Sequence, residues 1–91
     1  MTSDEKECIE SLRNPVTTEN DLMGWIDCAG TLLLVESVPE LVKLVMSERY
    51  SIATREHAAR TIKLLGSLDV SKFRQDATPA LNGLLDIIEN K

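Results

Sequence analysis

The chain of 91 residues has little of what reactive sites are usually built from. Trp25, Tyr50 and Phe73 are its aromatic residues, so a core must consist mainly of aliphatic side chains. Its two cysteines, Cys8 and Cys28, and its single histidine fall at no local chelating spacing such as Cys-x-x-Cys. We therefore expect neither a metal ion nor a cofactor.

Two further absences narrow the class of protein. The four glycines are isolated from one another, so there is no glycine-rich phosphate loop. No apolar run approaches the ~20 residues needed to span a bilayer, which argues against a membrane protein. Residues 1–7 are polar and acidic, and they fit neither a signal peptide nor a transit peptide. We expect a cytoplasmic protein with reduced thiols.

Charge is unevenly distributed along the chain. The net charge of −5 disfavours attraction to nucleic acids, and base-stacking aromatic residues are few. Residues 1–50 carry ten acids and four bases, a net of −6, whereas residues 51–91 carry five acids and six bases, a net of +1. The second half contains a loose basic group, which is most often a solvated helix face: Arg55, Arg60, Lys63, Lys72 and Arg74.

Apolar residues recur at helical spacing and never alternate strictly, so the sequence predicts helices throughout. The first should run from about Ser3 to Arg13. Four others are expected from Thr17 or Thr18 to about 35, from about 37 to Ser47, from Ser51 or Thr54 to about 66, and from Pro79 to Glu89. The apolar run 32–35 is interpreted as the end of a buried helix.

Three boundaries depend on particular residues. Ser37 and Glu40 have the spacing of a capping box. Gly66 suits a left-handed residue at a helix end. Pro79 either kinks a helix that starts near Val70 or begins a new one capped by Thr78, and we favour the new helix.

Residues 37–65 are predicted to form two amphipathic helices whose apolar stripes pack against one another. The small pair Ala58 and Ala59 allows the two helices to approach closely. The stripes consist of Leu41, Leu44 and Val45 on the first helix and of Ala58, Ala59, Ile62 and Leu65 on the second. This stretch resembles one unit of an armadillo or HEAT helical repeat.

Internal similarity favours the same interpretation. Residues 27–34 align with 57–64 at an offset of 30, and residues 38–45 align with 78–85 at an offset of 40. Armadillo and HEAT units are about 40–47 residues long with variable turns, so unequal offsets are tolerated.

The resemblance implies an all-α fold in one domain, residues 1–91, with about five helices stacked as a short right-handed superhelix. Armadillo proteins often bind extended peptides through Trp and Asn on the helix that corresponds to residues 54–66. The matching positions here hold Arg60 and Leu64, so the looser HEAT-like description fits better.

Such stacks usually bind other proteins, and we predict a non-enzymatic adaptor. Its partner surface would be the helix at about 54–65 with the preceding turn, where cations steer an acidic partner. The predicted partner-binding residues are Arg49, Tyr50, Arg55, Arg60 and Lys63.

Two and a half helix pairs leave an apolar face uncovered, since repeats bury their faces only against neighbours. The acidic N-terminal helix can serve as a polar cap, whereas the C-terminal helix is apolar on more than one side. We therefore hypothesise a homodimer that associates through Leu84, Leu85 and Ile87.

Two other functions stay open. One is a small regulatory or inhibitor protein, antitoxin-like or phage-type, which uses the acids of residues 4–10 and 19–27. The other is a small enzyme with a Cys28–His57 nucleophile pair. Against the enzyme, we expect Cys28 to be a core thiol and His57 an exposed residue at a helix start. Trp25 is expected in the core.

Overall fold

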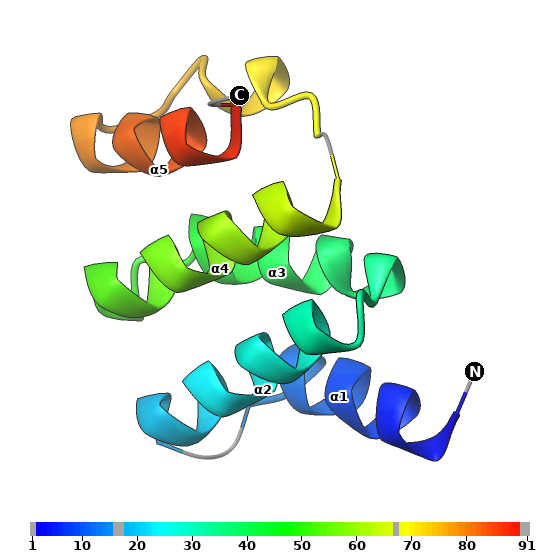
Figure 1. Ribbon diagram of the computed structural model, residues 1–91. Coiled ribbons are helices and arrows are strands. Elements are labelled where there is room, and N and C mark those ends of the chain that lie inside the picture. Colours follow the sequence, from blue (N-terminus) through cyan, green and yellow to red (C-terminus); the bar gives the residue numbers. More distant parts are fainter. Residues whose placement is uncertain (1, 16–17, 67, 90–91) are drawn as a thin grey trace.

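The computed structural model describes residues 2–15, 18–66 and 68–89. Within these residues the chain forms helices and no strand, which confirms the all-α class (Figure 1). The described elements are α1 (Ser3–Arg13), α2 (Glu19–Thr31), α3 (Val38–Met46), α4 (Ile52–Leu65) and α5 (Pro79–Glu89), with two short 3₁₀ helices, η1 (Val35–Ser37) and η2 (Ser71–Phe73).

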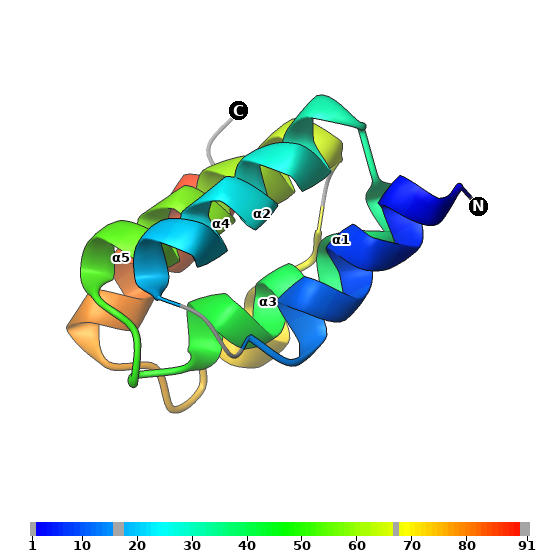
Figure 2. The ribbon, with the colours of Figure 1, turned by 90° about the horizontal axis from the view of Figure 1, so that it is seen from below.

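The helices lie in two layers. Helices α2, α4 and α5 run in the same direction side by side, and α1 and α3 run the opposite way behind them (Figures 1 and 2). Helix α4 is the centre of the arrangement, because it packs against α2, α3 and α5. Its outer face therefore belongs to the layer formed by α2, α4 and α5.

Most helix starts are read correctly from the sequence, because capping is local chemistry. The side chains of Thr18, Ser51 and Thr78 accept hydrogen bonds from amides of the first turns of α2, α4 and α5. Helix α1 begins with a capping box between Thr2 and Glu5. Thr17, the alternative cap for α2, lies outside the described residues.

The capping box expected at Ser37 and Glu40 is wrong. Ser37 ends η1 in a helical conformation, and its buried hydroxyl donates to the carbonyl oxygen of Leu34 at 2.7 Å. The buried Glu40 instead accepts a hydrogen bond from Arg13 Nε at 3.0 Å. Its Oε2 atom has no hydrogen-bond partner among the described residues. The preceding 3₁₀ turn thus removes Ser37 from the extended conformation that a cap needs.

Helix α2 ends at Thr31, four residues before the expected end. The amides of Leu33 and Leu34 bond to the carbonyls of Gly30 and Ala29, which is the Schellman pattern. Leu33 occupies the left-handed position of this motif with a φ of 51°. That conformation costs a side chain other than glycine about 1 kcal/mol.

The two predicted boundaries in the C-terminal part of the chain agree with the structure, except for the backbone conformation of Gly66. Helix α5 begins at Pro79, so the predicted break is confirmed. Gly66 ends α4 with φ 158° and ψ −169°, a region that other residues rarely adopt, and not with the expected left-handed conformation.

The predicted packing between α3 and α4 is confirmed. Leu41, Leu44, Ala58 and Ile62 are all buried in one continuous cluster of apolar side chains. The small Ala58 and Ala59 lie at the side of α4 that faces inward, so two layers of helices fit closely around it.

The prediction that Leu84 and Leu85 lie on a self-association surface is wrong, whereas association through Ile87 stays a prediction. Leu84 and Leu85 are only 2% and 1% exposed, and Ile87 is half-buried against the same core. Arg74, which follows η2, covers the polar side of α5 by donating to Asn82, Asp86 and Glu89. A polar cap thus lies at the C-terminal end, contrary to expectation, because α5 buries its apolar side against α4.

Candidate functional site

The five predicted partner-binding residues do not form one surface. Arg55 is 7% exposed, and its Nε donates to the carbonyl oxygen of Val45 at 2.9 Å. It therefore links α4 to the last turn of α3, whose carbonyls lack partners within the helix. The prediction that Arg55 contacts a partner is wrong, because its long stem packs inside while its charged head reaches a carbonyl.

Arg49 and Tyr50 lie in the connection between α3 and α4. Arg49 is exposed, and its Cζ atom lies 5.2 Å from the centre of the Tyr50 ring. Tyr50 is half-buried and packs against the core, so only part of its side chain is open to a partner. This pair stabilises the connection as well as presenting a cation beside it.

Arg60 and Lys63 lie on the outer face of α4, as predicted from the sequence. Both side chains are exposed. Arg60 Nη2 lies 3.7 Å from Glu56 Oε2, a solvent-exposed ion pair of the kind that contributes at most about 1 kcal/mol. Arg60 can therefore exchange this contact for a stronger one at little cost.

A groove of about 510 Å³ lies between α2 and α4. Its lining combines polar side chains with one large apolar residue, and comprises Asp27, Gly30, Thr31, His57, Arg60, Thr61 and Leu64. We call these residues the α2–α4 groove. It contains Arg60 from the predicted set, together with residues that the sequence did not single out as partner-binding.

Asp27 and His57 meet across the groove. Nε2 of His57 lies 2.5 Å from Oδ1 of Asp27, and the histidine is half-buried, not exposed as expected. The two residues occupy equivalent positions in the internal alignment at an offset of 30. Because successive helices in a stack contact their neighbours, equivalent positions become adjacent. That alignment was the available sequence signal for this pair.

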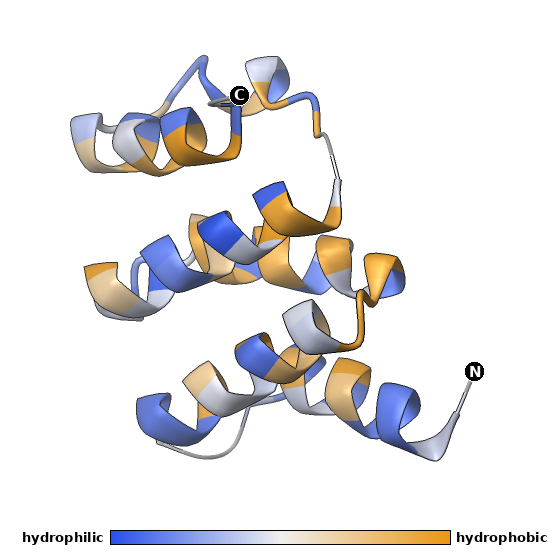
Figure 3. Cartoon of the chain, in the orientation of Figure 1, coloured by the Kyte–Doolittle hydropathy of each residue, from blue (hydrophilic) through white to orange (hydrophobic). Residues whose placement is uncertain are grey.

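Exposed apolar residues gather at the C-terminal ends of α2 and α4, which lie on the same side of the molecule (Figure 1). In Figure 3 the last turn of α4 and the segment that leads from α2 into η1 are coloured mainly as hydrophobic, whereas the last turn of α2 itself is pale. Leu33 is 66% exposed and Leu64 is 64% exposed, and Leu32 and Val35 are exposed as well. The run 32–35, expected to be buried, thus contributes mostly surface.

Two exposed acids of the N-terminal half, Glu19 and Asp27, bond to residues of α4 and of the turn before it. Oε1 of Glu19 accepts from the amide of Ser51 at 2.9 Å and from the Thr54 hydroxyl at 2.8 Å. These hydrogen bonds, that of the Ser51 amide first, hold the pKa of Glu19 below its ordinary value. With Asp27 paired to His57, the inhibitor hypothesis loses two of the carboxylates on which it depends.

Cys28 and His57 are not brought together around a common pocket. Cys28 lines a separate depression with Trp25, whereas His57 lines the α2–α4 groove. Across residues 2–15, 18–66 and 68–89, no three His, Cys, Asp or Glu side chains cluster as a metal site would require. In the same residues, no helix is both long and apolar enough to cross a bilayer.

Comparison of the chain with protein-family models, with curated proteins and with solved structures finds no match. The resemblance to armadillo and HEAT repeats therefore depends on the residues of this chain alone.

Proposed function

We propose that the chain is a non-enzymatic protein-binding module, built as a short HEAT-like stack, which binds an acidic segment of a partner protein along the α2–α4 groove. The observation that carries the proposal is the exposed Leu64 beside Arg60 in that groove, with Lys63 next to it on the outer face of α4.

The layered arrangement supports the architectural part. Helices α2, α4 and α5 lie side by side in one layer, and α1 and α3 lie in the other (Figure 2). In a HEAT-like superhelix one such layer forms the binding face. The α2–α4 groove runs between two helices of the same layer, where a partner segment contacts both at once.

Charge argues for the chemistry of the partner. The molecule carries a net charge of −5, so most of its surface repels an acidic segment. Arg60 and Lys63 provide a local exception on α4, which orients such a segment over the groove. An apolar side chain of the segment then packs against Leu64, and its carboxylates pair with the two cations.

Selection from a peptide display library tests this proposal. We expect the chain to enrich peptides that combine Asp or Glu with a large apolar residue. The double variant Arg60→Glu/Lys63→Glu should weaken binding of the selected peptides by roughly tenfold or more, about 1.4 kcal/mol. Leu64→Ser should weaken binding as well, through loss of apolar contact.

The matched control is Lys6→Glu/Lys72→Glu, which changes net charge equally at exposed cations outside the α2–α4 groove. Circular dichroism should show unchanged helicity in both double variants. If the Arg60/Lys63 variant binds the selected peptides as well as the control does, the α2–α4 groove is not the binding site.

A further inference from the structure

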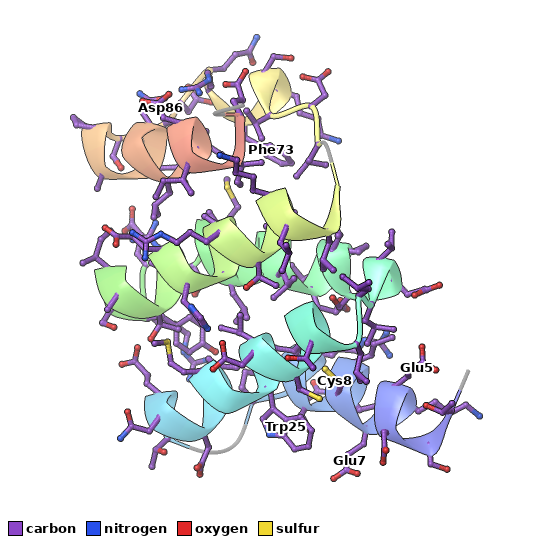
Figure 4. The ribbon with its side chains drawn as sticks, viewed as in Figure 1. Glu5, Glu7, Cys8, Trp25, Phe73 and Asp86 are labelled. Carbon is purple, nitrogen blue, oxygen red and sulfur yellow. The ribbon has the colours of Figure 1, made fainter. Side chains whose placement is uncertain are left out.

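Two cysteines, Cys8 and Cys28, lie near one another between α1 and α2. Cys8 is fully buried, and its Sγ lies 3.5 Å from the carbonyl oxygen of Trp25. A helical carbonyl points toward the residues three and four positions ahead, so this contact places Cys8 beside Cys28. Cys28 is also one of the groups that raise the pKa of Cys8, as a nearby thiol does, and Figure 4 shows Cys8 directed from α1 toward α2 near Trp25.

The two cysteines differ in access. Cys28 is half-buried and opens on a depression of about 490 Å³ that it lines with Asn20, Asp21, Gly24 and Trp25. Cys8 lies behind it with no exposed surface. Burial, with a smaller contribution from Cys28, raises the pKa of Cys8 to about 12. Reagents from solution therefore reach Cys28 first, while Cys8 stays a protonated neighbour.

We propose that Cys8 and Cys28 form a redox-active dithiol, which closes to an intramolecular disulfide between α1 and α2 on reaction with a small-molecule disulfide such as oxidised glutathione. This inference is independent of the proposed binding function, because it concerns other residues of α2 and a different chemistry.

The reaction proceeds in two exchanges. The Cys28 thiolate attacks one sulfur of the small disulfide, a mixed disulfide forms at Cys28, and one small thiolate leaves. The Cys8 sulfur then attacks the Cys28 sulfur, and the Cys8 proton passes to the departing second small thiolate, which leaves as a thiol. The Cys8–Cys28 bond forms as the mixed disulfide breaks. The protein loses two electrons and two protons, and the small disulfide is reduced to two thiols.

Mass spectrometry of the full chain treated with oxidised glutathione tests the proposal. The wild-type chain should lose the mass of two hydrogen atoms and stay monomeric on a non-reducing gel. Cys8→Ser should accumulate a stable glutathione adduct at Cys28, because the second exchange has no nucleophile. Cys28→Ser should react much more slowly, since its remaining thiol is enclosed.

Two readouts on the wild-type chain need no variant. Closing the loop between residues 8 and 28 should raise the melting temperature by roughly 5 °C or more, reversibly with a thiol reductant. Iodoacetamide under native conditions should modify Cys28 well before Cys8, as peptide mapping would show.

The proposal is overturned if the wild-type chain stops at the glutathione adduct or forms only intermolecular disulfides. It is also overturned if both cysteines are alkylated at equal rates.

Discussion

Helix α4 carries two arginines that look alike in the sequence and lie in different surroundings. Arg55 is buried and bonded to the end of α3, whereas Arg60 is exposed beside the groove toward α2. Five residues correspond to a turn of about 500° around a helix, so the two side chains point about 140° apart. Because α4 has neighbouring helices on three sides, the position of an arginine around the helix decides whether it is buried, like Arg55, or open to a partner, like Arg60.

The same contrast extends to neighbouring elements. The inner side of α4 has paired groups, such as Thr54 with Glu19, whereas its outer side has the weakly paired Arg60 and the exposed Leu64. Stability should therefore depend on the first set, and partner binding on the second. The predictions below are arranged to separate these two roles.

The largest effect is expected from Arg55→Ala. The substitution removes the hydrogen bond to Val45 and the packing of the arginine stem, so we expect a loss of about 2–3 kcal/mol in unfolding free energy. Urea denaturation followed by circular dichroism measures it. Arg60→Ala is the control and should change stability by about 0.5 kcal/mol or less. Equal losses in the two variants would remove the distinction between the two faces.

Leu33 tests whether an exposed apolar residue near the α2–α4 groove lowers the stability of the fold. Its left-handed conformation is strained and its side chain is mostly exposed. Leu33→Gly should relieve that strain and, after the added entropy of the unfolded glycine, raise stability by up to about 0.5 kcal/mol. Thermal denaturation measures this gain. A destabilised variant would show that the Leu33 side chain contributes to the fold.

Local chemistry explains which features could be predicted from the sequence. The caps at Thr18, Ser51 and Thr78 bond to amides three residues further on, so the starts of α2, α4 and α5 can be predicted from the local sequence. Ser37 has equally suitable chemistry, but the turn that precedes it puts its backbone in another conformation. Tertiary structure here overrides a local signal.

The site residues were harder to predict because apolar and charged positions cover more than one side of α4 and α5. Which side of α5 becomes buried is decided by its packing on α4, and the contacts of Arg74 with Asp86 and Glu89 on the polar side form only once the chain has turned back. Leu84 and Leu85 therefore looked available in the sequence and are buried in the fold. The exposure of Arg60 and Lys63 could be predicted because their positions around α4 alone place them on its outer face.

The smallest effect is expected from Glu19, which ties the start of α2 to the start of α4. Its pKa in the folded state is lowered from the ordinary 4.5 by the amide of Ser51 and the hydroxyl of Thr54. Its stabilising contribution is therefore complete above pH 4.5 and is lost as pH falls through the lower folded value.

Glu19→Gln should thus melt below the wild type at about pH 7, and the difference should shrink as the pH falls below 4.5, because the Glu19 carboxylate is then progressively protonated. The matched control is Glu48→Gln, at an exposed acid in the connection before α4, and its melting temperature should change with pH as that of the wild type does. A constant gap between Glu19→Gln and the wild type across this range would mean that the Glu19 charge contributes nothing. The bonds to α4 would then depend on the shape of the side chain alone, and the inner side of α4 would owe its stability to Arg55 and apolar packing.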